Sequence, residues 1–132
     1  MFERPIAAFD IETIPDPDVG RRIMGLEGSD REVVQQMVAL RESETEGRSQ
    51  YPQLPFHRVV IVGIAWLDPA TKRFKLGTTS GDVMDERTVL EGFFNMVSRS
   101  SKPPRLVSWN GGGFDVPVMR YRAMHHLSLI HI

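Results

Sequence analysis

An apolar run of nine residues, Val59–Leu67, sets the first limits on how this chain can fold. It is about half as long as a membrane-spanning helix, which needs roughly 20 apolar residues. Its β-branched residues, and the Asp68-Pro69 pair that ends it, are typical of a strand followed by a turn. We therefore predict a strand from Arg58 to Leu67.

The segment after this turn predicts a second strand, over residues 73–79. Phe74 and Leu76 alternate there with Lys75 and Gly77. This alternation is typical of an antiparallel hairpin that has one solvated face.

The remaining segments alternate between strand and helix patterns. A capping box at Ser29–Glu32 starts a helix, within a helical excursion over about residues 16–56. The strand over 105–109 is expected to return to the sheet beside the strand predicted over residues 6–11, the first in the chain, and parallel to it. Trp109 is expected to be a core aromatic. The chain is therefore expected to be an α/β protein with a mixed sheet. Its other predicted elements are a strand over 6–11 and helices over 85–98 and 114–126.

Length and charge allow several classes of protein to be excluded. The chain has 132 residues, a net charge of -1 and no cysteine. We expect one domain over residues 1–132, no disulfide or thiolate zinc site, no membrane segment and a cytoplasmic location. Because the charge is balanced, a nucleic-acid partner has to be argued from a local site.

Two carboxylates, Asp10 and Glu12, follow directly on the apolar run Ile6–Phe9. Residues two apart on a strand share one face, so both acids point the same way. Acids on a strand that is otherwise built for burial need a neutralising partner, and their hard oxygens suit Mg²⁺ or Mn²⁺. The alternative is that the strand ends at Phe9 and both acids lie in solvent.

Asp115 follows the strand over 105–109 and the turn Asn110–Gly113. If this strand is parallel to the first, Asp115 faces Asp10 and Glu12, because the carboxyl ends of parallel strands open at the same edge. Taken alone, Asp115 is a helix cap. Taken with the two acids, it predicts a metal site.

Two segments resemble the first and second motifs of the DnaQ-like (DEDD) 3′–5′ exonucleases. They are Phe9-Asp10-Ile11-Glu12-Thr13-Ile14-Pro15 and Ser108-Trp109-Asn110-Gly111-Gly112-Gly113-Phe114-Asp115-Val116-Pro117. The chain is most similar to stand-alone proteins related to the proofreading domain of family B DNA polymerases. The resemblance implies a ribonuclease H-like fold and a nucleic-acid substrate, most simply the 3′ end of single-stranded DNA, with RNA as the alternative. It also implies a context of DNA replication or repair.

The resemblance also implies roles for individual residues. Asp10, Glu12 and Asp115 match metal-binding carboxylates that hold two divalent cations, Mg²⁺ or Mn²⁺, for phosphodiester hydrolysis. The positions that match substrate-binding residues are Ile11, Thr13, Ile14, Asn110 and Phe114, of which Thr13 and Ile14 match those that hold the terminal nucleotide.

The sequence departs from the family pattern after the second motif. The family has a fourth carboxylate and a His or Tyr general base on a third motif, but no Asp or Glu follows Asp115 here. His125, His126 and His131 are poor substitutes, because late helical histidines usually face solvent or the helix end. We expect the domain to be incomplete at the C-terminal side and hydrolysis by this chain alone to be weak or absent.

Two other functions stay open. The strand around Asp10 also resembles the nucleophile strand of haloacid dehalogenase-like phosphatases, in which Asp10 would be phosphorylated. That resemblance leaves the segment Asn110–Asp115 unexplained. A non-catalytic nucleic-acid-binding module is the more serious alternative. The sequence also leaves open whether Arg58, Arg105, Arg120 and Arg122 line a strand path.

Overall fold

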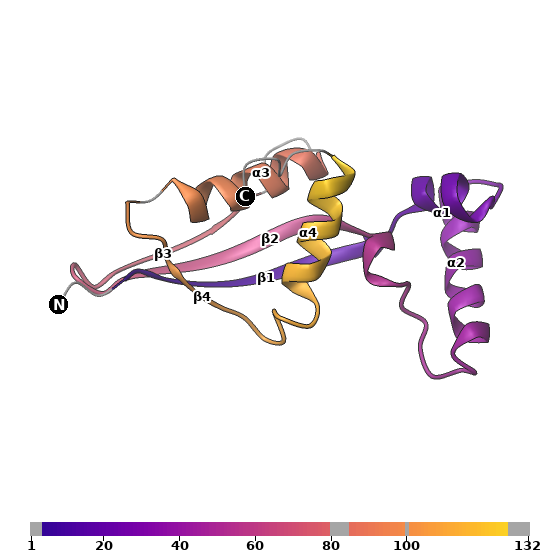
Figure 1. The fold of residues 1–132 in the computed structure, drawn as a ribbon, viewed down its shortest axis with the longest axis horizontal. Helices are drawn as coiled ribbons and strands as arrows, with labels where there is room; N and C mark the ends of the chain where they lie inside the picture. The colour runs from indigo at the N-terminus through magenta and orange to yellow at the C-terminus, as the bar shows by residue number, and fades with distance from the viewer. Residues whose placement is uncertain (1–3, 80–84, 100, 127–132) are drawn as a thin grey trace. The chain divides into compact units, whose positions relative to one another are not determined.

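The computed structural model describes residues 4–79, 85–99 and 101–126 (Figure 1). The chain divides into two compact units, one of residues 1–13 and 59–132 and the other of residues 14–58. The expectation of a single domain over residues 1–132 stays a prediction. The elements are β1 (Ile6–Pro15), α1 (Pro17–Met24), α2 (Asp30–Glu44), a 3₁₀ turn (Leu54–Phe56), β2 (His57–Asp68), β3 (Arg73–Thr78), α3 (Glu86–Ser98), β4 (Arg105–Val107) and α4 (Asp115–His125).

The four strands form one sheet in the order β3-β2-β1-β4. β2 and β3 pair antiparallel, with Asp68 opposite Arg73 at the turn. β4 pairs parallel with β1, with Ala8 opposite Val107. Both pairings were predicted from the sequence and are confirmed. The mixed sheet with its helices also confirms the predicted fold class, an α/β fold of the ribonuclease H-like kind.

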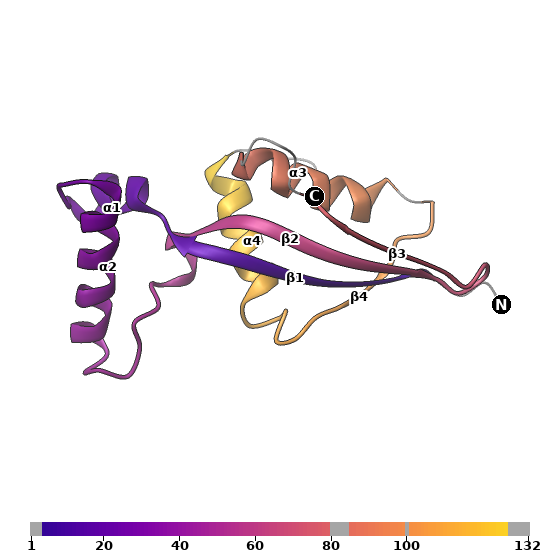
Figure 2. The same ribbon diagram turned by 180° about the vertical axis from the view of Figure 1, so that it is seen from behind.

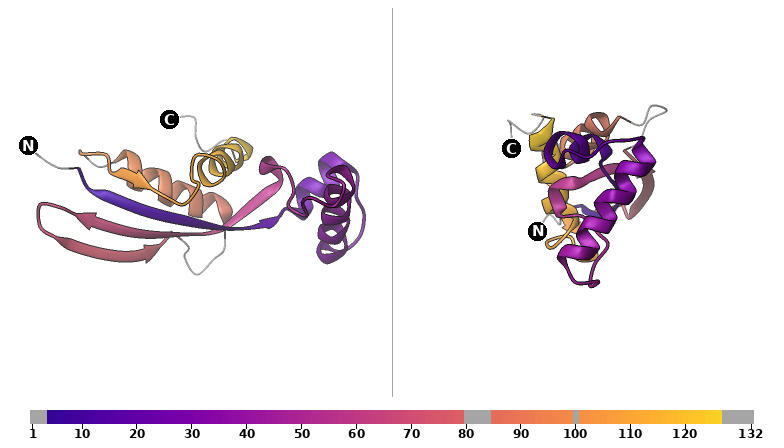
Figure 3. Two further views of the ribbon diagram at one scale, coloured as in Figure 1. Left: turned by 90° about the horizontal axis from the view of Figure 1, so that it is seen from below. Right: turned by 90° about the vertical axis from the view of Figure 1, so that its right-hand side faces the viewer.

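Helices α3 and α4 cover the same face of the sheet (Figure 3, left). Phe93 of α3 packs against Phe9 of β1, with the ring centroids 5.0 Å apart. Burying one such side chain contributes about 1.5–3 kcal/mol, so this layer is the main source of stability in the unit. Its core side chains, each at most 6% exposed, are Ala7, Phe9, Ile11, Val59, Val62, Val89, Leu90, Phe93, Val118, Met119 and Ala123.

Two strands differ from their predictions. All six residues of β3 are exposed, including Phe74 and Leu76, so the expectation of one solvated and one buried face is wrong. β3 is the last strand of the sheet on its side, and its side chains gain little cover from neighbouring elements. β4 ends at Val107, and Trp109 is 90% exposed, so its assignment to the core is also wrong. The chain leaves the sheet at Ser108, where the glycine-rich turn begins.

The unit of residues 14–58 is built on the contact between α1 and α2. A Cβ at Gly20 would lie 2.8 Å from both the Met37 Sδ and a methyl group of Val33, so the two helices approach too closely for any larger residue. The predicted capping box at Ser29–Glu32 is confirmed. The helix that it starts continues to Glu44.

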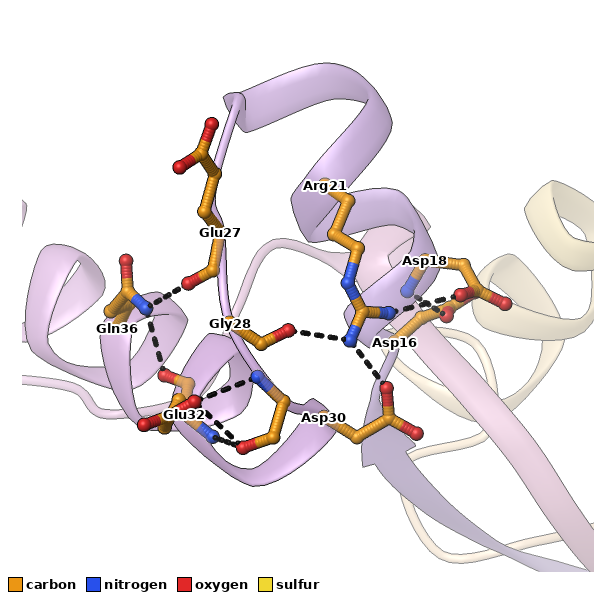
Figure 4. A network of polar contacts seen from close by, with 9 residues as sticks. Asp16, Asp18, Arg21, Glu27, Gly28, Asp30, Glu32 and Gln36 are labelled. Atoms are coloured by element: carbon orange, nitrogen blue, oxygen red, sulfur yellow. Dashed lines mark hydrogen bonds and ion pairs between the residues drawn. The ribbon is translucent and has the colours of Figure 1, made fainter.

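Arg21 links α1 to the start of α2 through a surface network (Figure 4). Its guanidinium donates to Asp18 Oδ1 at 3.2 Å, to Asp30 Oδ1 at 2.6 Å and to the Gly28 carbonyl at 3.0 Å. The network fixes the connection between the two helices. Among the helices that the structure describes, none is long and apolar enough to cross a membrane.

Candidate active site

The turn between β4 and α4 folds back on itself (Figures 1 and 2). The Asn110 carbonyl accepts hydrogen bonds from the Gly113 and Phe114 N–H groups, both at 3.0 Å. The Gly111 carbonyl accepts from the Val116 N–H at 2.9 Å. Asn110 has a φ of +54°, a left-handed conformation that asparagine tolerates better than most residues. These bonds fix the start of α4.

The three glycines of this turn have different roles. A Cβ at Gly111 would lie 1.6 Å from the Ser108 Oγ and 2.8 Å from the Ser108 Cβ. A Cβ at Gly113 would lie 2.6 Å from the Asn110 Oδ1. A Cβ at Gly112 would meet nothing within 4 Å. Packing therefore requires glycine at position 111. At position 113 a larger residue would only displace the exposed Asn110 side chain, and Gly112 lies beside open space.

Asp115, the first residue of α4, is only 3% exposed. Its Oδ2 atom has no hydrogen-bond partner among the described residues. Burial raises the pKa of its carboxyl, and the charge of Asp10 raises it further. Hydrogen bonds from the backbone of Asp115 itself and of Ile11 act in the opposite direction and lower that pKa. The carboxyl of Asp115 therefore lies at β1, close enough to Asp10 to sense its charge.

Asp10 and Glu12 are exposed residues of β1, and they alternate with the buried Phe9 and Ile11. The two acids therefore share the face of the strand that is turned away from the core, as the sequence pattern predicts. Of these two acids, only Asp10 contributes to the shifted pKa of Asp115. Among residues 4–79, 85–99 and 101–126, no group of three or more His, Asp or Glu side chains is close enough to hold a metal ion.

Residues 49–130 match the family model described as "predicted 3′–5′ exonuclease related to the exonuclease domain of PolB". The match covers more than half of the chain. The chain belongs to this exonuclease family. The matched range includes the glycine-rich turn and Asp115, whereas Asp10 and Glu12 precede it.

A polymerase relative agrees with this family assignment. The chain is 48% identical over 48 residues to the catalytic subunit of DNA polymerase epsilon from Dictyostelium discoideum. The matched stretch is 36% of the chain and 2% of that protein, so the chain spans only a small part of this curated relative. No solved structure is significantly similar to the chain. The resemblance to exonucleases related to family B DNA polymerases is confirmed.

The chemistry of Asp10 and Asp115 suits a divalent cation, as expected for an exonuclease of this family. The unpartnered Asp115 Oδ2 is a buried hard oxygen, and a second carboxylate lies close enough to act on its pKa. Two neighbouring carboxylates repel each other unless a proton or a cation neutralises them. Mg²⁺ and Mn²⁺ prefer such oxygen ligands. Asp10 and Asp115 therefore offer the kind of oxygen ligand that such a cation binds.

The positions that match the substrate-binding residues of this exonuclease family lie in different environments. Ile11 is only 6% exposed, so its side chain belongs to the core and only its backbone is left for a substrate. Thr13 is half-buried at the end of its unit, and Ile14, 44% exposed, belongs to the other unit. Asn110 is exposed and Phe114 is half-buried in the turn before Asp115.

A second buried carboxylate, Glu86, was not foreseen from the sequence. Arg122 Nε lies 3.0 Å from both oxygens of Glu86, and Arg122 Nη2 lies 2.7 Å from its Oε1. Glu86 also accepts from the Val59 N–H at 2.6 Å and contacts His126 Nε2 at 2.5 Å. Arg122 is therefore held in the core and is not available to a nucleic-acid strand. His125 is exposed, and His131 lies outside the described residues.

Proposed function

We propose that this chain carries the active-site strand and turn of a metal-dependent 3′–5′ exonuclease that acts on single-stranded DNA, with RNA as the alternative substrate. The family assignment supports an exonuclease-like hydrolase. The observation that carries the proposal is the buried Asp115 carboxyl at the start of α4, whose Oδ2 has no hydrogen-bond partner among the described residues. This carboxyl lies where a parallel strand pair opens, which is the usual place for a site in an α/β sheet.

In this proposal Asp10, Glu12 and Asp115 hold the divalent cations, Mg²⁺ or Mn²⁺. Two such cations, when bound, lower the pKa of a water and stabilise the leaving 3′ oxygen of the phosphodiester. The chain itself orients the site. Asp115 is fixed by the turn bonds at Gly111 and Asn110, and Asp10 by the pairing of β1 with its neighbours.

The same turn supplies groups for binding the strand. Asn110 is exposed and offers an amide for hydrogen bonds, and Phe114 offers an aromatic face. The backbone at Gly112 has free space beside it and lets a phosphate approach closely. Thr13 is proposed to hold the terminal nucleotide, and the role that the resemblance implies for Ile14 stays a prediction. The similarity to a DNA polymerase favours a role in DNA replication or repair.

Metal-dependent stabilisation tests the proposal without relying on activity. We expect Mn²⁺ to raise the Tm of the chain, and Asp10→Ala or Asp115→Ala to remove that rise. Asp18→Ala, which changes an exposed acid of the other unit, is the matched control and should keep it. If Mn²⁺ stabilises all four proteins equally, the metal site is wrong.

A nuclease assay then separates the enzyme from a binding module. The chain is incubated with 5′-labelled single-stranded DNA and Mn²⁺, and shortening from the 3′ end is followed on a gel. Shortening that Asp115→Ala abolishes supports the exonuclease. Binding of the same DNA without shortening supports the non-catalytic nucleic-acid-binding alternative for the chain by itself.

A further inference from the structure

Trp109 is the most exposed large apolar residue among those that the structure describes, at 90%. Tryptophan has a large apolar surface, and leaving it in water forgoes a favourable burial of about 25 cal/mol per Å². The chain's other tryptophan, Trp66 of β2, is half-buried. The exposure of Trp109 therefore needs a separate explanation.

The turn places Trp109 beside the candidate site. It stands directly before Asn110, whose carbonyl accepts the two hydrogen bonds that close the turn onto the start of α4. The same turn ends at Asp115. Trp109 is therefore the chain neighbour of Asn110, the residue of this turn that the proposed function assigns to strand binding.

We infer that Trp109 is a stacking platform for an unpaired base of the nucleic-acid strand. The inference rests on the proposed function and specifies how the substrate is held. An indole ring stacks on any base, because every base has a π-face, so the contact supplies affinity without sequence preference. Bases within a duplex are already stacked on their neighbours, so the platform favours single strands.

Fluorescence of Trp109 reports the contact directly. The Trp66→Phe variant leaves Trp109 as the single tryptophan, and Ca²⁺ replaces Mn²⁺ so that the strand is not cleaved. The probes are a twelve-nucleotide oligo(dT) and an abasic strand of the same length, which keeps the phosphates and lacks the bases. We expect oligo(dT) to quench the fluorescence and the abasic strand to leave it unchanged.

Affinity measurements on the full chain complete the test. Trp109→Ala should weaken oligo(dT) binding by roughly 5- to 150-fold, the equivalent of one base–aromatic stack. It should leave binding of the abasic strand unchanged, and Trp109→Phe should retain most of the affinity. Tyr51→Ala, which removes an aromatic that is 76% exposed in the other unit, is the control and should have no effect.

The outcomes separate this inference from the proposed function. Equal binding of the two probes, or unchanged oligo(dT) binding by Trp109→Ala, overturns the stacking role and leaves the exonuclease proposal standing. If the unmodified chain binds neither probe, the proposed function fails and the stacking role fails with it.

Discussion

Glu86 and Asp115 are two buried carboxylates in equivalent positions, each the first residue of a helix and each 3% exposed. Their surroundings differ. Glu86 contacts an arginine, a histidine and a backbone N–H group. Asp115 keeps one oxygen without a hydrogen-bond partner among the described residues, and the charged group that acts on its pKa is another acid, Asp10.

The difference separates a buried carboxylate whose charge is compensated from one whose charge is not. A helix N-terminus favours a negative charge by less than about 2 kcal/mol, which does not offset the burial of a charge that has no cation beside it. Arg122 supplies the cation for Glu86. No described basic side chain is paired with Asp115, so its charge is left for a proton or a metal ion to neutralise.

The largest expected effect comes from removing the cation of Glu86. Arg122→Ala leaves a buried carboxylate with only the Val59 N–H and His126 as partners. The loss of one member of a buried ion pair costs about 3–5 kcal/mol, so a large fall in the free energy of unfolding is expected in urea titrations. Arg87→Ala removes the exposed partner of Glu91 and should have a several-fold smaller effect. Equal losses of the free energy of unfolding in the two variants would contradict this expectation, because the buried Glu86 cluster would then contribute no more stability than an exposed ion pair.

The second largest effect on stability is expected from changes in the turn that positions Asp115. Gly111→Ala puts a methyl group against Ser108, an overpacking that costs about 1–3 kcal/mol. Gly112→Ala meets open space and should change stability by less than about 0.5 kcal/mol. Thermal unfolding of the two variants measures the difference. The double variant Ser108→Gly/Gly111→Ala should recover most of the loss, and no recovery would contradict the assigned clash.

Sequence patterns predict those features of the molecule whose interacting residues lie close together in the chain. The capping box at Ser29–Glu32 could be predicted because both partners lie within one helical turn. The parallel pairing of β4 with β1 could also be predicted, since the helix that precedes β4 lets the chain return to the sheet in that direction. The Glu86–Arg122 pair could not, because its members are 36 residues apart and nothing local couples them.

The exposure of Trp109 shows a second limit of sequence patterns. Trp109 follows the apolar Leu106-Val107 pair after one serine, Ser108, a spacing that matches a continued strand, so the pattern alone assigns it to the core. In the structure β4 ends at Val107, and the turn that follows folds Gly111 close to Ser108. The residues of the strand alone do not show this turn.

The next prediction concerns pH and tests the carboxylate of the comparison that lacks a cation, Asp115. The folded state raises the pKa of Asp115 above its ordinary value of 3.8, so between that value and the raised one the folded chain binds more protons than the unfolded chain. In EDTA, the contribution of Asp115 therefore lowers the free energy of unfolding as pH rises through this window. Asp115→Asn should remove this loss and raise the free energy of unfolding at neutral pH.

The Asp10→Asn variant separates the two causes of the raised pKa of Asp115, and its expected effect is smaller. Burial is the larger cause of the raised pKa of Asp115, and the charge of Asp10 is secondary. Carboxyl NMR titration of the Asp10→Asn variant should therefore find the pKa of Asp115 lower than in the unmodified chain but still above its ordinary value. A full return to that value would mean that the repulsion between the two acids, rather than burial, sets Asp115 apart from Glu86. The contrast between the two regions would then rest on which charges lie near each carboxylate. A pKa that stays raised shows that Asp115 is held in an apolar position that only a neutralising ion can make favourable at neutral pH.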